Sequence, residues 1–314
     1  MTDLLTFVLC IENNAIRAQA LLLCDSIRQF GGRHRRARIL VVAPRPGHGV
    51  DRYTRQRLAA LEADYVEAPL NVVCPEYGSA NRVFTAAWAE EEIGSEWIAV
   101  LDSDTLFLGE LDLPPDADVA VRPVDVKGSA TAGSGDQFED YWRRLADLQG
   151  IPLDRLPFVT TTVSDHRVRA SYNGGLVVVR RQQGVLGAWA DLFARSVAAG
   201  LKPWRGRDIN VHASTGLVGR EASEYWGSNQ AALALAIWSR TARVVLYAPS
   251  HNVPLHLLPQ RPQLIADLRR SPLVHVHYHW LFTDRYHRAA LALIRHLGAE
   301  PDQVDWLAAR LPIR

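Results

Sequence analysis

Two carboxylates, one residue apart, directly follow a strongly apolar segment of the chain. Residues 97–101 are continuously apolar, as expected for a central strand buried on both faces, and Asp102, Ser103 and Asp104 come next. In open α/β sheets, ligands bind at the carboxyl ends of the strands. Two acids at such a turn can approach one hard divalent cation, whose remaining positions suit phosphate oxygens. The alternative is a strand-terminating turn in which aspartate accepts backbone N–H groups.

Three histidines alternate along a strand-like segment near the other end of the chain. His275, His277 and His279 occupy every second position of residues 274–280, so their side chains share a face if the segment is extended. One or more of these imidazoles would suit Mn²⁺, which accepts mixed oxygen and nitrogen ligands. A histidine in a strand is also commonly an ordinary core or surface residue. The spacing alone does not say which histidine would bind.

Polar amides precede two further apolar segments. Asn173 and Gly174 stand before the β-prone residues 175–179, where glycine allows a ligand to approach closely and the amide offers a donor and an acceptor to a sugar hydroxyl. A plain Asn-Gly turn is the alternative. Gln230 stands at the start of an alanine- and leucine-rich segment, so it can lie at a helix N-terminus that faces a sugar or phosphate. The alternative is that these polar residues have only a structural role, with Ser228 as the N-cap of the helix.

The elements that must position these residues alternate in type. In the first third of the chain, short apolar strands alternate with amphipathic helices, which predicts a parallel sheet covered by helices on both faces. Residues 127–135 are rich in glycine, serine, alanine and threonine, and we expect a mobile surface loop that could act as a lid. The expected strands are 6–11, 38–42, 65–67, 97–101, 119–121, 175–179, 243–247 and 273–278, and the expected helices are 15–30, 52–62, 80–92, 138–148, 185–197, 229–237 and 287–296.

Composition excludes several classes of protein. The 314 residues include 35 Lys plus Arg and 34 Asp plus Glu, so no bulk charge recruits nucleic acid. No apolar run approaches the roughly 20 residues of a spanning helix, which predicts that the chain does not cross a membrane. Cys10, Cys24 and Cys74 lack the spacing of a disulfide framework or a zinc site. We therefore expect a protein of the reducing cytoplasm.

Taken in order, these segments resemble the GT-A fold glycosyltransferases, nearest to the glycogenin-like and bacterial lipopolysaccharide galactosyltransferase-like group. The resemblance rests on the strand 6–11, the acidic motif in 100–106, the Tyr-Asn-Gly-Gly step at 172–175, the Asn-Gln pair at 229–230 and the His-Tyr pair at 277–278. It implies an α/β fold with a Rossmann-like, mixed and mostly parallel sheet sandwiched by helices. It also implies a single domain over residues 1–314, with a nucleotide-binding half up to about residue 125 and an acceptor-binding half over about 126–314.

The same resemblance implies a chemistry. A metal-dependent enzyme of this kind moves a sugar from a nucleotide-sugar donor, here a UDP- or GDP-sugar, to a hydroxyl acceptor such as a saccharide or small molecule. The metal, Mn²⁺ or Mg²⁺, would be bound by Asp102 and Asp104 with His277, or with His279 as the alternate. Asn173 and Gln230 would lie at the reacting sugar. The donor-binding residues implied by the resemblance are Glu12, Asn13 and Asn14 at the base, Ser103 at the ribose, Arg82 at the phosphate or sugar, and Asn173 with Gly174.

The chain also departs from the family pattern. In the family, the late histidine is usually followed by a glycine and a Lys-Pro-Trp that contact phosphate. This chain has Trp280, Leu281 and Phe282 there instead. The charge of the phosphates would therefore have to be neutralised by the metal together with an arginine, Arg285 or Arg288. The resemblance implies that the configuration of the sugar is retained. An amide at Gln230 is too weak a nucleophile for a covalent step, so retention would proceed by front-face attack. Inversion would need a carboxylate base, with Asp165 or Glu224 as candidates. The alternatives are a haloacid-dehalogenase-like phosphatase and an inert nucleotide- or glycan-binding module.

Overall fold

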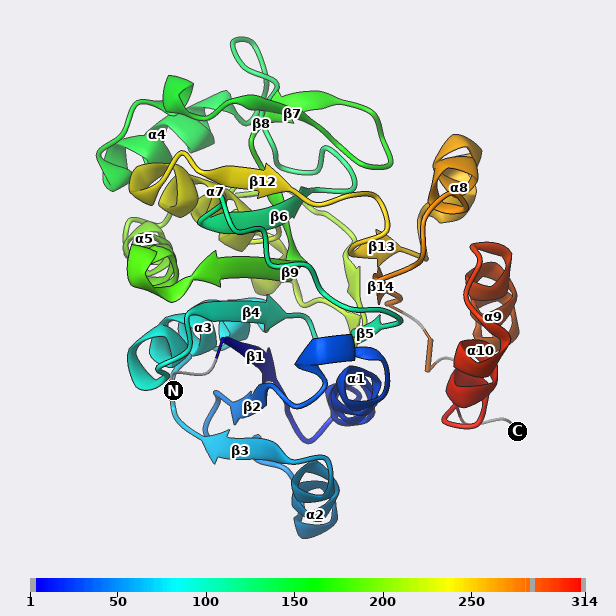
Figure 1. The fold of residues 1–314 in the computed structure, drawn as a ribbon. Coiled ribbons are helices and arrows are strands. Elements are labelled where there is room, and N and C mark those ends of the chain that lie inside the picture. Colours follow the sequence, from blue (N-terminus) through cyan, green and yellow to red (C-terminus); the bar gives the residue numbers. More distant parts are fainter. Residues whose placement is uncertain (1–3, 280, 283–285, 312–314) are drawn as a thin grey trace.

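A seven-stranded sheet runs through the centre of the molecule in the computed structural model, which describes residues 4–279, 281–282 and 286–311 (Figure 1). The strand order is β12-β6-β9-β4-β1-β2-β3, and β9 alone runs antiparallel to its neighbours. The expected mixed, mostly parallel sheet is therefore confirmed. Its strands are β1 (Leu5–Cys10), β2 (Arg38–Ala43), β3 (Ala63–Glu67), β4 (Trp97–Leu101), β6 (Val119–Pro123), β9 (Tyr172–Arg180) and β12 (Val244–Leu246).

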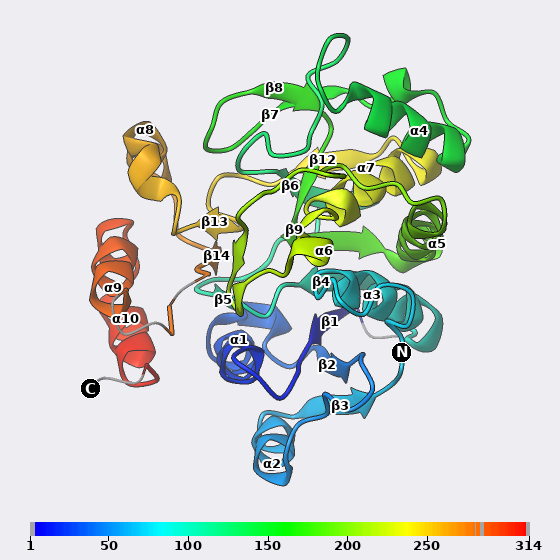
Figure 2. The same ribbon diagram turned by 180° about the vertical axis from the view of Figure 1, so that it is seen from behind.

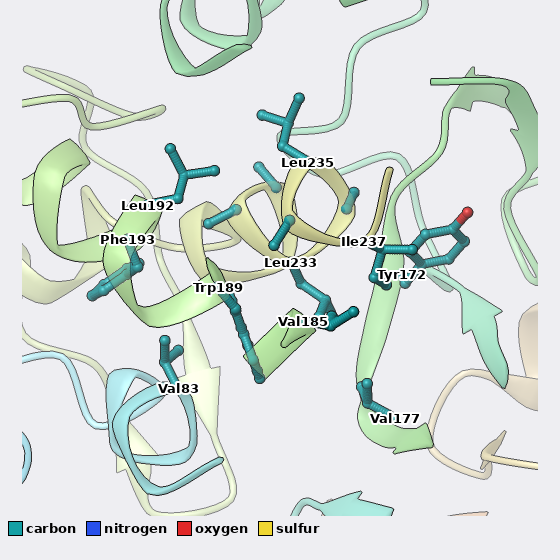
Figure 3. Close-up of a cluster of buried hydrophobic side chains, with 14 of the residues drawn as sticks. Val83, Tyr172, Val177, Val185, Trp189, Leu192, Phe193, Leu233, Leu235 and Ile237 are labelled. Carbon is teal, nitrogen blue, oxygen red and sulfur yellow. The ribbon is translucent and has the colours of Figure 1, made fainter. Parts of the chain in front are cut away.

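Helices cover both faces of this sheet because its strands are apolar on both sides. Val8 of β1 belongs to the core beneath one set of helices, and Phe7 and Leu9 belong to the core beneath the other. On the first face, α3, α5 and α7 lie side by side (Figure 2), and Figure 3 shows Trp189 of α5 and Leu233 of α7 among their buried side chains. The first face carries α3 (Ala80–Glu92), α4 (Glu139–Gln149), α5 (Val185–Ala198) and α7 (Ser228–Arg240), and the second carries α1 (Ile16–Phe30) and α2 (Arg52–Ala60).

A second, three-stranded sheet lies at the carboxyl edge of the main one. Its order is β13-β14-β5, with β13 parallel and β5 antiparallel to β14. A third core connects it to the C-terminal helices. These elements are β5 (Thr105–Phe107), β13 (Val253–Pro254), β14 (His275–His277), α8 (Pro262–Leu268), α9 (His287–His296) and α10 (Pro301–Ala308).

The remaining elements are short. Two hairpins stand apart from the sheets, and one of them reaches the candidate site described below. They are β7 (Phe158–Thr160) with β8 (Arg167–Arg169), and β10 (His212–Ala213) with β11 (Gly216–Leu217); α6 (Arg220–Ser223) follows the second hairpin. Within the described residues, no helix combines the length and the apolar character that crossing a membrane requires.

Most expected elements are present, with two informative differences. The expected strand 273–278 is shorter, and it belongs to the small sheet. The expected surface loop 127–135 has no regular structure, but Ser129, Ala130 and Thr131 are buried. The indole Nε1 of Trp142 donates to the Ser129 carbonyl at 2.8 Å, and the Thr131 hydroxyl donates to Glu139 at 2.7 Å. Part of this loop is therefore packed against α4, and the expectation of a purely surface loop is wrong there.

Candidate active site

The reversed direction of β9 brings its first residues to the last residues of β4. Leu101 pairs with Leu176, and the Asp102 N–H donates to the Gly175 carbonyl at 3.2 Å. An antiparallel strand begins where its neighbour ends, so Asn173 and Gly174 lie beside the acidic motif. The structure thus joins two motifs that are about seventy residues apart in the chain.

The small sheet brings the histidines to the same place. β5 follows Asp104 directly and pairs antiparallel with β14, with His277 opposite Thr105. The Tyr278 N–H then donates to the Asp104 carbonyl at 3.1 Å. This pairing places His277 and His279 on either side of the Asp104 carboxylate.

Asp104, His277 and His279 form a group that can hold a metal ion. One ligand atom from each lies within 4.8 Å of the others, and no second group of three such side chains occurs in the part of the chain that the structure describes. His279 Nδ1 lies 2.6 Å from Asp104 Oδ2, and His277 Nε2 lies 3.2 Å from Asp104 Oδ1 without hydrogen-bond geometry. Burial opposes ionisation of both groups. The imidazoles nevertheless hold the pKa of Asp104 well below its usual range, and Asp104 raises the pKa of His277 to about 9.

These side chains suit a divalent cation of intermediate softness. The group offers carboxylate oxygen and imidazole nitrogen, the mixture that Mn²⁺ accepts. Both ring nitrogens of His277 are buried, and neither has a hydrogen-bond partner among the described residues. A buried imidazole nitrogen without a partner is costly unless a ligand satisfies it. The residues present therefore fit the metal that the resemblance implies.

Asp102 is engaged differently from Asp104. Its Oδ1 accepts from Arg82 Nη1 in a short ion pair, and it is not part of the three-residue group. Gly174 makes this arrangement possible, because a Cβ there would lie 2.5 Å from the Arg82 Cζ. Glycine is needed here for close approach, as the sequence suggested, but the group that approaches is a guanidinium of the same chain.

Two adjoining cavities meet at this ion pair. The first has a volume of about 280 Å³ and extends to the end of β1, and the second has a volume of about 240 Å³ and extends to the start of α7. The side chains of Arg82 and Asp102 line both cavities, as do Ala213 and Ser214 at the end of β10. Of the predicted site residues, Glu12, Asn14, Ser103 and Asp104 line only the first cavity, and Asn173, Gln230, His277 and His279 line only the second.

Two of the predicted donor-binding residues line neither cavity. Asn13 is exposed; its N–H donates to the His48 carbonyl at 3.0 Å and its Oδ1 accepts from Arg17 at 3.1 Å. Gly174 contacts Arg82 as described above but is not itself a lining residue. Glu12 lines the first cavity with its carboxylate already bound by Arg45 and by the Asn81 amide at 2.9 Å.

The remaining candidates are those for the catalytic base of an inverting reaction and for the arginine at the phosphates. Glu224 accepts from Lys202 Nζ at 2.8 Å, and Asp165 pairs with Arg261 at 3.2 Å. Neither acid lines either cavity, and neither does Arg288. Arg285 lies outside the described residues.

Sequence reasoning missed Asp125. It lines the second cavity, and its Oδ2 accepts from the Asn173 amide at 2.5 Å while its Oδ1 accepts from the Thr162 hydroxyl at 2.6 Å. Burial raises the pKa of this carboxyl. A lone aspartate carries no motif, but Asp125 lies just beyond the expected strand 119–121. The strand-end rule that singled out Asp102 could have found it as well.

Residues 7–204 match the family described as the Rhodobacterales glycosyltransferase domain. The chain belongs to this glycosyltransferase family. The expected GT-A glycosyltransferase is thereby confirmed, and the phosphatase alternative is not supported. The match contains both aspartates and Asn173, whereas Gln230, His277 and His279 lie beyond it. The place of those three residues in this glycosyltransferase rests on geometry.

Solved structures resemble the chain in fold at low sequence identity. The bifunctional glycosyltransferase WbbM, solved in its apo form, shares 12% identity at a TM-score of 0.55, covering 99% of this chain and 52% of WbbM. The chain therefore spans about half the length of WbbM. The galactosyltransferase LgtC, solved with donor and acceptor sugar analogues, shares 13% identity at a TM-score of 0.47, covering 98% of this chain and 97% of LgtC. No curated protein matches the chain in sequence.

Proposed function

We propose that this glycosyltransferase moves a sugar from a UDP- or GDP-sugar to a hydroxyl acceptor, that it needs Mn²⁺ or Mg²⁺, and that it retains the configuration of the sugar. One observation carries the proposal: the group of Asp104, His277 and His279 lies where two cavities adjoin. A donor needs one cavity for its nucleotide and one for its sugar, with its diphosphate between them. The division of the chain near residue 125 into nucleotide and acceptor halves stays a prediction.

The diphosphate would lie at the junction of the cavities. A divalent ion held by Asp104, His277 and His279 would stabilise the charge that develops on the leaving nucleoside diphosphate. Arg82 supplies a second positive charge there, held in place by Asp102 and by the bare backbone of Gly174. Its Nε has no hydrogen-bond partner among the described residues, which fits a role toward a phosphate oxygen.

The sugar and the acceptor would share the second cavity. Asn173 is fixed there, because its amide donates to Asp125 and its carbonyl accepts from the Gly175 N–H at 2.8 Å. Gln230, at the start of α7, lines the same cavity. Its amide is too weak a nucleophile to form a covalent intermediate. This supports attack by the acceptor on the face that the diphosphate leaves, so that the diphosphate takes the acceptor's proton.

A donor panel tests the proposal. Wild type is incubated with UDP- and GDP-sugars, Mn²⁺ and mixed saccharide acceptors, and release of nucleoside diphosphate is followed. We expect release from donors of one base, and NMR of the glycoside should show the donor's anomeric configuration. Slow hydrolysis of the donor without acceptor would separate an enzyme from an inert binding module. Absence of release from every donor would contradict the proposal.

We also propose a cytoplasmic location. Support comes from Cys10, Cys24 and Cys74, which are buried free thiols. Unpaired cysteines are typical of proteins in reducing compartments.

A further inference from the structure

We propose that Asn252 is a positioning residue that orients His277 for metal binding; this role rests on the metal site proposed above. Asn252 is 2% exposed and immediately precedes β13. β13 pairs with β14 so that Pro254 lies opposite His277. The backbone of Asn252 has a φ of +52°, a left-handed conformation that asparagine tolerates better than most residues. The turn before β13 thus places a buried amide next to the strand that carries the ligand.

Asn252 and His277 have complementary unsatisfied atoms. Neither the Oδ1 nor the Nδ2 of Asn252 has a hydrogen-bond partner among the described residues, and the same is true of both ring nitrogens of His277. A buried polar atom without a hydrogen-bond partner is destabilising. Two such side chains next to one another point to a hydrogen bond that forms in another state of the site.

The bare backbone of Gly175 provides the space for that bond. A Cβ on Gly175 would lie 2.6 Å from Asn252 Oδ1 and 2.8 Å from His277 Nδ1. Both atoms therefore lie beside one point that only glycine leaves open. Any larger residue would displace one or the other.

The two nitrogens of His277 then have separate roles. Nε2 faces the Asp104 carboxylate at 3.2 Å, so Nδ1 faces the opposite way, toward Gly175 and Asn252. A histidine that binds a metal through one nitrogen usually donates the N–H of the other to an oxygen, which fixes its tautomer and orientation. We assign that oxygen to Asn252 Oδ1, which would accept from His277 Nδ1–H when Nε2 binds the ion.

The test measures Mn²⁺ affinity without nucleotide, from the EPR signal of free Mn²⁺. Asn252→Gly removes the side chain and suits the left-handed backbone, and we expect it to weaken Mn²⁺ binding roughly 10- to 100-fold. Asn252→Asp keeps the acceptor oxygen and should stay within a few fold of wild type. Glu62→Gly is the matched control, because Glu62 is exposed and has a φ of +53°. It should bind Mn²⁺ as wild type does.

The outcomes separate this inference from the proposed function. Equal Mn²⁺ affinity of Asn252→Gly and wild type would overturn the role of Asn252 and leave the metal site in place. No Mn²⁺ binding by wild type would overturn the metal site itself. A second readout uses Zn²⁺ as a diamagnetic probe: ¹⁵N NMR should show the proton of His277 on Nδ1 in wild type. In Asn252→Gly that proton should exchange faster with water.

Discussion

Asp102 and Asp104 stand one residue apart but contact different partners. Asp104 lies against two imidazoles, whereas Asp102 is paired with the guanidinium of Arg82. An acid beside two imidazoles can share a cation with them, and an acid that neutralises an arginine has less charge to offer a metal. In the proposed site, Asp104 is therefore the main carboxylate ligand of the metal, and Asp102 mainly orients Arg82.

This difference predicts unequal effects of two matched substitutions. Asp104→Asn removes a metal ligand and should weaken Mn²⁺ binding more than roughly 100-fold. Loss of a hydrogen bond that only supports a ligand weakens metal binding by at most about that factor. Asp102→Asn should weaken it by no more than about 10-fold and should mainly reduce nucleoside diphosphate affinity. Calorimetric titration of each variant with Mn²⁺, and then with nucleotide, checks both statements. Equal loss of Mn²⁺ binding in the two variants would show that both acids bind the metal.

At the scale of elements, the site depends on two strand pairings that join distant parts of the chain. The pairing of β4 with β9 delivers Asn173 to the acidic motif, and the pairing of β5 with β14 delivers His277 and His279. The apolar run 97–101 was enough to predict the strand and the position of the acids at its end. The direction of β9 was not predictable from its residues, because a run buried on both faces looks the same in either orientation.

The small sheet shows a second limit of sequence reasoning. β5 has only three residues, Thr105–Phe107, and follows β4 after a short turn, so it is too short to be predicted as a separate strand. Without this strand, the pattern of residues does not place His277 near Asp104, and only the family resemblance joined the two. The alternation of histidines predicted a shared face, but His275 is fully buried against Phe107, with ring centres 4.6 Å apart, and is not part of the metal group.

A prediction at this scale concerns how α3 supports α5. The carboxylate of Glu90, on α3, accepts from the N–H groups of Leu186 at 3.1 Å and Gly187 at 2.8 Å, in the first turn of α5. It therefore caps that helix from a neighbouring element. Glu90→Ala should lower the free energy of unfolding by about 1–2 kcal/mol. Urea unfolding measures this, with exposed Glu92→Ala on the same helix as the control. Equal stability of the two variants would contradict the capping role.

At the scale of the whole molecule, burial makes stability depend on pH. His251 stacks on Tyr247 with ring centres 4.4 Å apart, and burial lowers the pKa of His251 to about 4. The unfolded chain protonates this histidine below about pH 6.5, whereas the folded chain does so only near pH 4. Its contribution is therefore complete above pH 6.5 and is lost as the pH falls toward 4, by at most about 3 kcal/mol.

His251→Phe tests that contribution. Phenylalanine keeps a ring against Tyr247 and cannot take up a proton, so the variant should lose less stability than wild type between pH 6.5 and 4. Denaturant unfolding at several pH values measures the difference. We expect the free energies of unfolding of the two proteins to converge as the pH falls, because the variant loses less stability than wild type. Parallel curves for the two proteins would show that His251 does not carry this pH dependence.

We propose above all that the two cavities bind a nucleoside diphosphate through a metal at Asp104, His277 and His279. Thermal unfolding of wild type and Asp104→Asn, with UDP or GDP and with or without Mn²⁺, tests it most directly. Ligand at ~100 times its Kd should add about 2.7 kcal/mol to stability. We predict a rise in Tm with one of the two nucleotides that requires Mn²⁺ and is lost in Asp104→Asn. An equal rise without Mn²⁺, or the same rise in the variant, would contradict it.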